Sequence, residues 1–574
     1  MCGIIGYCGK KQAVPILLAG LNSLLYRGYD SSGVCVFDGE KLELRKDVGI
    51  LKIDESIIGK MGIGHTRWSS HGEVSQINSH PHLSCDKKIA VAHNGIIENY
   101  QQLKSELKKQ GHTFVSETDT EVIPHYLEGG KDLLESIKGL NSMLVGSYAY
   151  VVLSSEGIFG TRDGASLFIG MDEDGYYIGS DFFAFSNCQK IISLDDGDIV
   201  QICDGGFKHY DKNLSPKNKT LLNAEMVSNN YHNSDRHYMI EEIEQQAEVL
   251  LSTIQQNRNN FDEVANLISQ AGQVIITACG SSRYASLIGR YLISRVGKKF
   301  CDVIMASEFK YFDDAVDRET VVLAVSQSGE TADVIDGVKR AKDKGAKIIS
   351  ILNRHNSILG DLSDHTIYLN CGNEIAVAAT KSFVSQLVVF YMLTHKMVNK
   401  LDEACLKLEG VVKSVNSEIH NDGLKELAEI LSKKNDIYYI ARGINFAIAS
   451  EGALKLKEVS YVHAEGLPAG ELKHGTLSLI EKGTPVIVIC PDDYTYDDTL
   501  NNAIESKTRG AYIVGVSDKY SSVFDYWIKI DKVDELLYPI VEIIPLQILA
   551  YYVAINRGLN PDRPRNLAKS VTVK

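Results

Sequence analysis

The sequence predicts an α+β N-terminal domain followed by two α/β domains with parallel sheets. Short β-prone segments separated by Asn, Asp and Gly turns dominate the first two hundred residues, with few amphipathic helices between them. From residue 240 onward, helices alternate with apolar strands, which is typical of a parallel sheet. This second pattern occurs twice, because a strand meets a glycine turn and a helix at Gly280 and again at Gly443.

Composition limits the classes of protein to which the chain can belong. Its 574 residues are too many for one core and indicate three or four units of about 100–200 residues. The formal net charge of −14 argues against a general binder of nucleic acid or of anionic membranes. The 11 cysteines are odd in number and form no CxxC pair, which favours a reducing cytoplasm over a disulfide framework. We therefore expect a cytoplasmic protein without nucleic-acid or membrane partners.

Three further patterns concern membranes, secretion and metals. The most apolar stretch, 536–555, is interrupted by Glu542 and two prolines, so a buried helix is favoured over a membrane span. The N-terminus lacks a basic region followed by an apolar core, so we expect no secretory signal. His80-Pro81-His82 does not have the spacing of metal ligands on a helix. We expect no metal and no cofactor.

Turn residues and periodicity divide the chain into segments. The polar stretch 211–239 carries no clear period and is expected to be a linker. Predicted helices of the first half cover 11–25, 100–110, 120–128 and 133–140. Predicted strands cover 2–7, 32–37, 62–65, 88–93, 148–153, 157–161, 176–180 and 198–203, and in the second half 274–278, 321–325, 347–352, 437–441, 485–490 and 511–516.

Cys2 is the first candidate catalytic residue. Once Met1 is removed, it carries a thiol and a free α-amine on the same carbon. The amine, with a reference pKa of roughly 7.7–8.0, can act as a general base for the thiol. A small residue opening a buried strand explains the cysteine equally well, so a catalytic role depends on partners elsewhere in the chain.

Loops further along the chain supply such partners. Arg67 can hold a carboxylate through paired hydrogen bonds, although a surface salt bridge is the simpler interpretation. The side chain of Asn94 and the backbone N–H of Gly95 fit an oxyanion hole, but Asn-Gly is also a strong turn signal. Asp119 can accept a substrate ammonium, or Asp119 or Thr118 can cap a helix. Together these groups suit hydrolysis of the amide of an amino acid, and glutamine fits.

The segments around these residues resemble the glutaminase domain of the N-terminal-nucleophile amidotransferases. The resemblance rests on residues 2–6, 27–33, 65–68, 93–99 and 116–121. It implies a four-layer αββα fold over residues 2–210 and a γ-glutamyl thioester on Cys2 that releases ammonia. It also implies that Trp68 gates the ammonia and that Ser70, which replaces a threonine, keeps a hydroxyl beside the glutamine. The glutamine-binding residues that it implies are Arg67, Trp68, Ser70, His80, Gly95 and Asp119.

The second half contains two turns suited to phosphate. Small residues let backbone N–H groups approach an anion, hydroxyls donate to it, and a helix N-terminus favours negative charge. Ser326-Gln327-Ser328-Gly329-Glu330-Thr331 meets this description, and Gly280-Ser281-Ser282 repeats it. Helix capping alone also explains either turn. Because no GxxxxGK[ST] motif is present, a nucleoside triphosphate is not expected.

These turns resemble sugar isomerase (SIS) domains, which bind phosphosugars, over residues 240–415 and 416–561. Lys455 and Glu458 share one face of a predicted helix, which a solvated ion pair also explains, and His474 lies between glycines. The tail 562–574 would otherwise be interpreted as frayed. With these segments, the whole chain resembles the glutamine-dependent aminotransferases that convert fructose 6-phosphate to glucosamine 6-phosphate, the first step of hexosamine biosynthesis.

The resemblance implies a role for each residue of the sugar site. Lys569 forms a Schiff base with the open ketose, and Glu458, aided by Lys455, moves the proton between C1 and C2. His474 assists ring opening from the neighbouring subunit, which implies a homodimer, and the tail 562–574 closes the site. Ala379 departs from the family, which often has a serine there. The residues implied to contact the sugar phosphate are Ser282, Ser326, Gln327, Ser328, Thr331, Val377 and Ala568.

Other functions fit parts of the same pattern. An amidotransferase of this build could act on another ketose phosphate, because no residue type reports sugar stereochemistry directly. A catalytically inactive phosphosugar sensor is a second alternative, against which the joint presence of Cys2, Glu458, His474 and Lys569 argues. A stand-alone glutaminase leaves the duplicated half unused.

Overall fold

The chain folds into two compact units, Met1–Asn233 with Ser570–Lys574, and Ser234–Lys569. Each unit is considered separately below. The structure is a computed structural model, and it describes residues 2–51, 57–69, 71–185, 188, 190–203, 205–218, 222–223, 236–355, 357–419 and 423–572.

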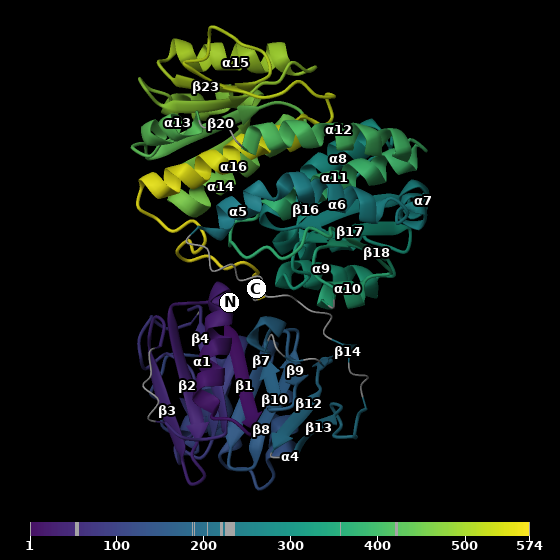
Figure 1. The fold of residues 1–574 in the computed structure, drawn as a ribbon. Helices are drawn as coiled ribbons and strands as arrows, with labels where there is room; N and C mark the ends of the chain where they lie inside the picture. The colour runs from purple at the N-terminus through teal and green to yellow at the C-terminus, as the bar shows by residue number, and fades with distance from the viewer. Residues whose placement is uncertain are drawn as a thin grey trace. The chain divides into compact units, whose positions relative to one another are not determined.

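The first unit contains two antiparallel sheets (Figure 1). One has the strand order β14-β11-β9-β10-β1-β4-β2-β3, and the other has the order β13-β12-β8-β7-β6-β5. The strands of the first sheet are β1 (Gly3–Gly9), β2 (Ser31–Phe37), β3 (Leu42–Val48), β4 (Met61–Arg67), β9 (Phe168–Met171), β10 (Gly175–Gly179), β11 (Lys190–Ser193) and β14 (Leu222–Asn223). The strands of the second sheet are β5 (His82–Leu83), β6 (Ala90–Ile97), β7 (Gly146–Ser154), β8 (Gly157–Asp163), β12 (Ile199–Cys203) and β13 (Gly206–Tyr210).

Helices cover the outer faces of both sheets and complete a four-layer αββα fold. Successive side chains of a strand point to opposite faces, so Ile4 packs between the sheets while Ile5 packs outward with Leu17 of the helix α1. On the second sheet, Val91 packs outward against Leu103. The predicted fold of this half is therefore confirmed. The helices are α1 (Ala13–Ser23), η1 (Leu25–Arg27), α2 (Tyr100–Lys109), α3 (Val122–Leu127), α4 (Leu133–Asn141) and η2 (Phe182–Phe185).

The second unit contains two parallel sheets, with orders β16-β15-β17-β18-β19 and β21-β20-β22-β23-β24. The corresponding strands have the same order in both, which confirms the predicted duplication. The strands are β15 (Gln273–Ala278), β16 (Asp302–Met305), β17 (Thr320–Ser326), β18 (Lys347–Leu352), β19 (His365–Tyr368), β20 (Asp436–Ala441), β21 (His463–Pro468), β22 (Pro485–Ile489), β23 (Tyr512–Ser517) and β24 (Tyr526–Lys529).

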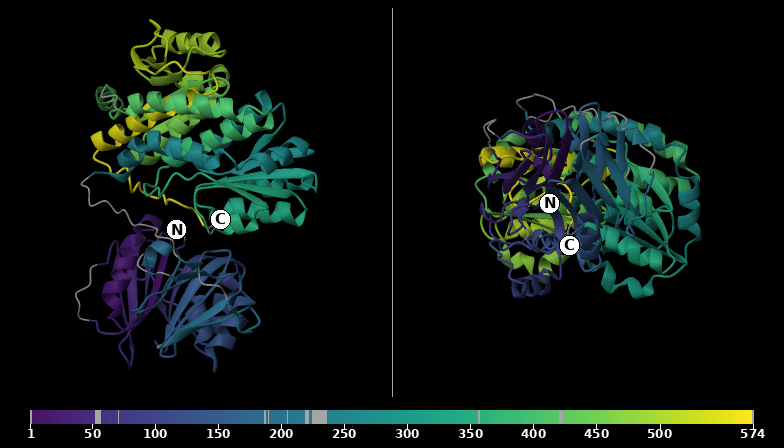
Figure 2. Two further views of the ribbon diagram at one scale, coloured as in Figure 1. Left: turned by 45° about the vertical axis from the view of Figure 1, so that its right-hand side comes forward. Right: turned by 90° about the horizontal axis from the view of Figure 1, so that it is seen from below.

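One continuous core joins the two parallel-sheet domains of this unit. It contains side chains of both sheets together with those of long apolar helices such as α11 and α16. Figures 1 and 2 show α16 lying against α14, which also contacts α8 of the first sheet domain. The helices are α5 (Tyr238–Glu244), α6 (Gln246–Asn257), α7 (Asp262–Gln270), α8 (Gly280–Arg295), η3 (Ala306–Tyr311), η4 (Asp313–Ala315), α9 (Ala332–Asp343), α10 (Ile358–Leu362), α11 (Lys381–Met397), α12 (Leu401–Ile419), α13 (Leu424–Leu431), α14 (Asn445–Ser460), η5 (Ala469–His474), η6 (Thr476–Leu479), α15 (Tyr496–Thr508) and α16 (Tyr538–Asn556).

The helix α16 is long and apolar enough to cross a membrane by length and composition, and among the described residues it is the one such helix. Inside this protein, 83% of its apolar window is buried. It therefore packs as the core helix that its interrupting Glu542 and prolines predicted.

The predicted strands and helices are confirmed with shifts of a few residues at their ends, but several strands were missed. The clearest is β3, whose Leu-Glu-Leu-Arg-Lys-Asp-Val sequence is dominated by charge. It forms the edge of its sheet, where charged side chains face water and block pairing with another chain. Much of the predicted linker 211–239 lies outside the described residues.

Candidate active sites

Cys2 lies immediately before β1, a central strand that pairs with β4 and β10. This pairing sets Gly3 opposite Thr66 and brings the thiol to the end of β4. The Cys2 Sγ lies 3.4 Å from the backbone nitrogen of Trp68 and 3.6 Å from its carbonyl oxygen. Burial raises the pKa of the Cys2 thiol, so nucleophilic attack requires a base to remove its proton.

Two buried side chains fix the backbone of Cys2. Arg27 Nε donates to the Cys2 carbonyl at 3.2 Å, and Asn94 Nδ2 donates to the same oxygen at 2.9 Å. Arg27 is itself held by an ion pair with Asp181 at 2.9 Å. The nucleophile therefore sits on a rigid strand end rather than on a flexible terminus.

Arg67 is the last residue of β4 and is 3% exposed, so the prediction of a surface salt bridge is wrong. Its guanidinium donates to the carbonyls of His71, Glu73 and Gly72, the last two at 3.2 Å. No ion pair to Arg67 is found among the described residues. A buried guanidinium without a carboxylate partner is costly unless an anion binds it, which suits the carboxylate of a substrate.

Asn94 and Gly95 lie inside β6, where they pair with Ala149 and Tyr148, so the hairpin-turn interpretation is wrong. Gly95 has a φ of +119°, and a Cβ at this position would lie 2.1 Å from the carbonyl oxygen of Ser147. The glycine is required because neither the backbone conformation nor the space accepts a side chain.

Asp119 is 4% exposed, and its Oδ2 accepts a hydrogen bond from the backbone of Ile97 at 2.8 Å. The prediction that Asp119 or Thr118 caps a helix is wrong, because α3 begins only at Val122 and has no side-chain cap. Asp119 instead links the loop before α3 to the end of β6. Its second carboxylate oxygen has no hydrogen bond from a described residue and suits a substrate ammonium.

The remaining residues predicted to bind glutamine are His80, Trp68 and Ser70. His80 is buried, and its Nδ1 lies 3.2 Å from His65 Nε2, which in turn donates to the carbonyl of His93 at 2.9 Å and lies 3.2 Å from Asn94 Oδ1. His80 therefore supports Asn94 through His65. Burial lowers the pKa of both histidines, to about 3 for His65, so the pair is neutral at physiological pH. Trp68 is half-buried, and Ser70 lies outside the described residues.

In the second unit, the strand order places a topological switch point at the predicted phosphate turns. The chain runs from β15 to β16 on one side and then to β17 on the other, and α8 and α9 pack on opposite faces of this sheet. Ligands of open α/β sheets bind at such a switch point, beyond the carboxyl ends of the strands. The turns after β15 and β17 both end at this point.

Hydroxyl groups line these two turns. Ser326 Oγ lies 3.0 Å from Thr331 Oγ1 and accepts from the backbone of Gly329 at 3.1 Å. Ser282 Oγ accepts from Gln386 Nε2 at 3.0 Å. Thr331 sits at the N-cap of α9 but makes no side-chain cap bond, so helix capping alone does not explain it.

The helix α14 presents three ionisable side chains to this region. Lys455 is fully buried and lies 2.6 Å from Glu458, 3.4 Å from Glu451 and 3.0 Å from Ser281 Oγ. The solvated-face interpretation is therefore wrong. Burial opposes the charge of Lys455, but Glu451 and Glu458 more than compensate and raise its pKa. Burial also raises the pKa of Glu451 to about 7, with Lys455 opposing the shift and Glu458 adding to it.

Lys569 of the C-terminal tail is buried and forms an ion pair with Glu374 at 2.5 Å, so this part of the tail is not frayed. Glu374 also accepts from the backbone and hydroxyl of Ser382. Burial disfavours its charge, but the Lys569 ammonium and the Ser382 hydrogen bonds lower the pKa of Glu374 to about 2. Glu374 contributes to the raised pKa of Lys455 as well, so both lysines share one electrostatic environment.

The other residues predicted for the sugar site include Val377, Ala568, Gln327 and His474. The Val377 backbone donates to the carbonyl of Asp562 at 3.3 Å, which ties the tail to the loop before α11. Ala568 is half-buried beside Lys569, and Gln327 accepts through its backbone carbonyl from Asn353. His474 ends η5, is exposed, and has no hydrogen bond from its side chain among the described residues.

Sequence reasoning missed three supporting residues as parts of the sites. Glu451 could have been found, because it lies four residues before Lys455 on the same helix face. Arg27 belongs to a quoted motif, but nothing in its spacing links it to Cys2. Glu374 carries no local signal, since only the fold brings it to Lys569, 195 positions away.

Comparisons with known proteins agree with this architecture. A glutamine amidotransferase domain matches residues 65–187, and a SIS domain matches residues 267–396 and 430–557. Proteins named glutamine–fructose-6-phosphate aminotransferase (isomerizing) from Thermococcus kodakarensis and Pyrococcus horikoshii are each 42% identical over the full length of both chains. The solved C-terminal domain of glucosamine-fructose-6-phosphate aminotransferase from Francisella tularensis matches with a TM-score of 0.55 and 33% identity, covering 58% of this chain and 99% of that one.

The fold and these matches define the class of protein, a glutamine amidotransferase with a duplicated SIS unit. Relatives of this identity span the whole chain, so the match is not confined to one domain. The chain belongs to the glutamine–fructose-6-phosphate aminotransferase (isomerizing) family of enzymes.

Proposed function

We propose that the chain transfers the amide nitrogen of glutamine to fructose 6-phosphate, with isomerisation, to give glucosamine 6-phosphate and glutamate. The observation that carries this proposal is the buried Lys569 amine, held by Glu374 in a unit whose sheet also provides a hydroxyl-lined switch point. A lysine amine that can condense with a ketose distinguishes an aminating enzyme from a sensor or a simple glutaminase.

In the first unit, Cys2 attacks the side-chain amide of glutamine, and its own α-amine accepts the thiol proton after removal of Met1. Asn94 Nδ2 and the N–H of Gly95 stabilise the tetrahedral oxyanion. Arg67 holds the glutamine carboxylate and Asp119 its ammonium, which orients the amide toward Cys2. Release of ammonia leaves a γ-glutamyl thioester, which water hydrolyses to glutamate.

In the second unit, the phosphate binds at the turns that contain Ser282, Ser326, Gln327, Ser328 and Thr331, where hydroxyls and helix N-termini favour an anion. Backbone groups of Val377 and Ala568 position the sugar. The amine of Lys569 adds to the open ketose and loses water to form a Schiff base, and ammonia then displaces Lys569. Glu458 transfers the proton between C2 and C1, while Lys455 orients it through their 2.6 Å ion pair.

We also propose that the protein is a homodimer in which each sugar site uses His474 of the neighbouring subunit, and that it is located in the cytoplasm. His474 is exposed and its side chain has no hydrogen-bond partner among the described residues, which suits a role in a neighbouring subunit of a homodimer, where it assists ring opening. No disulfide links the described cysteines, which suits a reducing cytoplasm. No feature of the proposal requires a nucleic-acid or membrane partner.

We also propose domain boundaries at 2–210 for the glutaminase, 211–239 for the linker, 240–415 and 416–561 for the SIS domains, and 562–574 for the closing tail. The sheets of the second unit lie within the two SIS ranges, since they span Gln273–Tyr368 and Asp436–Lys529. The helix α12 continues through residue 415, so the SIS domains share a helix at their junction.

A coupled assay of two variants tests the function. Cys2→Ala should abolish glutamine-dependent glucosamine 6-phosphate while leaving fructose 6-phosphate binding intact. Lys569→Ala should abolish amination while leaving basal hydrolysis of glutamine. If Cys2→Ala forms product from glutamine at the wild-type rate, or if other ketose phosphates are better substrates, the assignment fails.

A further inference from the structure

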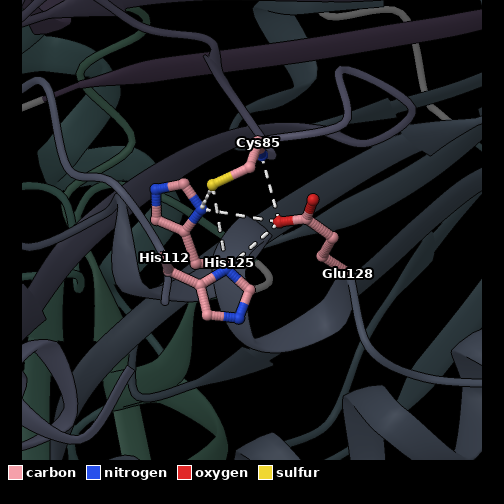
Figure 3. A group of neighbouring side chains, drawn as sticks. All are labelled: Cys85, His112, His125 and Glu128. Atoms are coloured by element: carbon pink, nitrogen blue, oxygen red, sulfur yellow. Dashed lines mark hydrogen bonds and ion pairs between the residues drawn. The ribbon is translucent and has the colours of Figure 1, made fainter. Parts of the chain in front are cut away.

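A cluster of four potential metal ligands lies in the first unit, outside both proposed active sites (Figure 3). It consists of Cys85, His112, His125 and Glu128. Their ligand atoms, one from each residue, all lie within 4.8 Å of one another. Figure 3 shows the thiol, both imidazole Nδ1 atoms and one carboxylate oxygen facing a common centre.

Four of the six separations between these ligand atoms lie close to the edge lengths of a tetrahedral site. Cys85 Sγ lies 3.8 Å from His112 Nδ1 and 3.5 Å from His125 Nδ1. Glu128 Oε2 lies 3.2 Å from His112 Nδ1 and 3.8 Å from His125 Nδ1. Bonds of about 2.3 Å to sulfur and about 2.0–2.1 Å to nitrogen and oxygen require edges of about 3.3–3.6 Å around a tetrahedral zinc ion. The other two separations, between the two imidazoles and between the thiol and the carboxylate, are within 4.8 Å, so shifts of up to about an ångström convert the cluster into a coordination sphere.

The neighbours of the cluster orient its members as ligands. His125 Nε2 lies 3.4 Å from Glu121 Oε1, the carboxylate–histidine arrangement that directs the opposite ring nitrogen to a metal. With the Nε2 proton facing Glu121, the Nδ1 lone pair of His125 faces the thiol and an acceptor carboxylate. Backbone N–H groups of Cys85 and Asp86 anchor Glu128 at 3.0 and 2.7 Å. A cation at this centre binds all of these atoms through their lone pairs.

We propose that Cys85, His112, His125 and Glu128 bind a structural zinc ion. Four mixed sulfur, nitrogen and oxygen donors suit Zn²⁺ and exclude Mg²⁺ or Ca²⁺, which require more oxygen ligands. Binding releases the Cys85 thiol proton to solvent, because the thiolate is the ligand. The expectation of no metal came from a search for local spacing, and here only His125 and Glu128 are close in sequence.

The proposed ion joins three segments that adjoin those carrying the glutamine-site residues. Cys85 follows β5, His112 follows α2, and His125 and Glu128 belong to α3 and its C-terminal cap. Through Glu121, which accepts from the backbone of Ser116 at 2.7 Å, the site also fixes the loop that contains Asp119. The ion therefore stabilises the loop and takes no part in the chemical reaction.

Metal content of the full-length chain tests the proposal. The parent for this test is Cys2→Ser, so that the active-site thiol and amine do not add a second ligand set. After incubation with equimolar zinc and dialysis against a weak chelator, this parent should retain one zinc ion per chain. Adding Cys85→Ser or His112→Gln should abolish retention, while Cys203→Ser, a half-buried cysteine of the same unit, should not alter it.

Two further measurements separate loss of the site from loss of folding. With chelator present, the parent and the Cys85→Ser variant should unfold at the same temperature. With zinc at one hundred times its dissociation constant, the unfolding temperature of the parent should rise by about 5–10 °C, and that of the Cys85→Ser variant should not change. Cobalt(II) should give a thiolate charge-transfer band in the parent alone. Substoichiometric zinc in the parent, or equal retention in the Cys85→Ser and His112→Gln variants, overturns the proposal.

Discussion

At the scale of single residues, burial decides which charged side chains serve the sites. Arg67 and Lys455 look like surface residues in the sequence, yet they are 3% and 0% exposed. Lys455 is neutralised by carboxylates on its own helix, whereas Arg67 has no ion pair among the described residues. The first pattern is a preorganised charge network, and the second suits the binding of an anion.

The Lys569–Glu374 pair permits a test at this scale. Glu374→Gln should lower the free energy of unfolding by about 3–5 kcal/mol at pH 7, because it leaves the buried Lys569 ammonium unpaired. Adding Lys569→Met should restore most of the loss, since no uncompensated charge remains. Thermal unfolding of the wild type, both single variants and the double variant measures this cycle.

The sign of the pH dependence gives a second readout for this pair. Because the folded pKa of Glu374 is about 2, below its usual 4.5, its contribution is fully present above pH 4.5 and is lost as the pH falls toward 2. A double variant as unstable as Glu374→Gln, or a wild type without this acid-dependent loss, contradicts the assignment.

At the scale of elements, α16 shows how a core helix can contain a destabilising group. Glu542 is 0% exposed, and neither carboxylate oxygen has a hydrogen bond in the described part of the chain. Burial, with smaller contributions from Asp493 and Asp518, raises its pKa well above 4.5. The folded protein therefore holds Glu542 protonated within an otherwise apolar helix.

Replacing this carboxyl should stabilise the helix in a pH-dependent way. A raised folded pKa means that stability falls as the pH rises above 4.5, by up to about 1.4 kcal/mol per pH unit until the folded pKa is reached. Glu542→Gln should therefore melt at a higher temperature than the wild type at pH 8 and at nearly the same temperature at pH 4. Glu429→Gln, at an exposed carboxyl on α13, is the control, and an equal gain at both pH values counts against the idea.

At the scale of the whole molecule, two reactions must be coupled across the chain. Ammonia that reaches neutral water is protonated and loses its nucleophilicity, so the product formed per glutamine consumed reports on protected transfer. Trp68 is the proposed gate, since its backbone contacts the Cys2 thiol directly.

Trp68→Ala should leave glutamine hydrolysis active and reduce the ratio of glucosamine 6-phosphate to glutamate severalfold. Trp527→Phe is the matched control, because Trp527 is the other tryptophan of the chain and lies on β24. Glucosamine 6-phosphate and glutamate are measured in parallel for each variant. If Trp68→Ala gives the same ratio of the two products as the wild type, Trp68 is not the ammonia gate.

The assembly makes a separate prediction. If His474 serves the Lys569 of a partner subunit, homodimers of His474→Asn and of Lys569→Ala should both be nearly inactive in amination. Mixing the two chains and allowing subunit exchange should restore about one quarter of wild-type activity, because half of the dimers are mixed and each has one intact site. Mixed dimers can be purified with a different affinity tag on each chain. If these mixed dimers show no amination activity, His474 is not shared between subunits.

The sequence by itself determined the fold class and the duplicated half, because strand and helix periods are local properties that a single chain displays. It also made Cys2, Asn94 and Gly95 candidates through their combination with Arg67 and Asp119, whereas Lys569 became a candidate only through the family resemblance. Strand ends shifted by a few residues, and edge strands such as β3 were missed because their side chains face water.

Only the tertiary structure decided which residues are partners. Glu374 meets Lys569 and Cys85 meets His112 and His125 through long-range packing, and sequence spacing contains no record of such contacts. It also overturned the local interpretations that the sequence favoured for single residues, since Asn94 lies in a strand and not in a turn, and Arg67 lies in the interior. The physical reason is that burial and pairing, which set the cost of a charge, are properties of the folded chain.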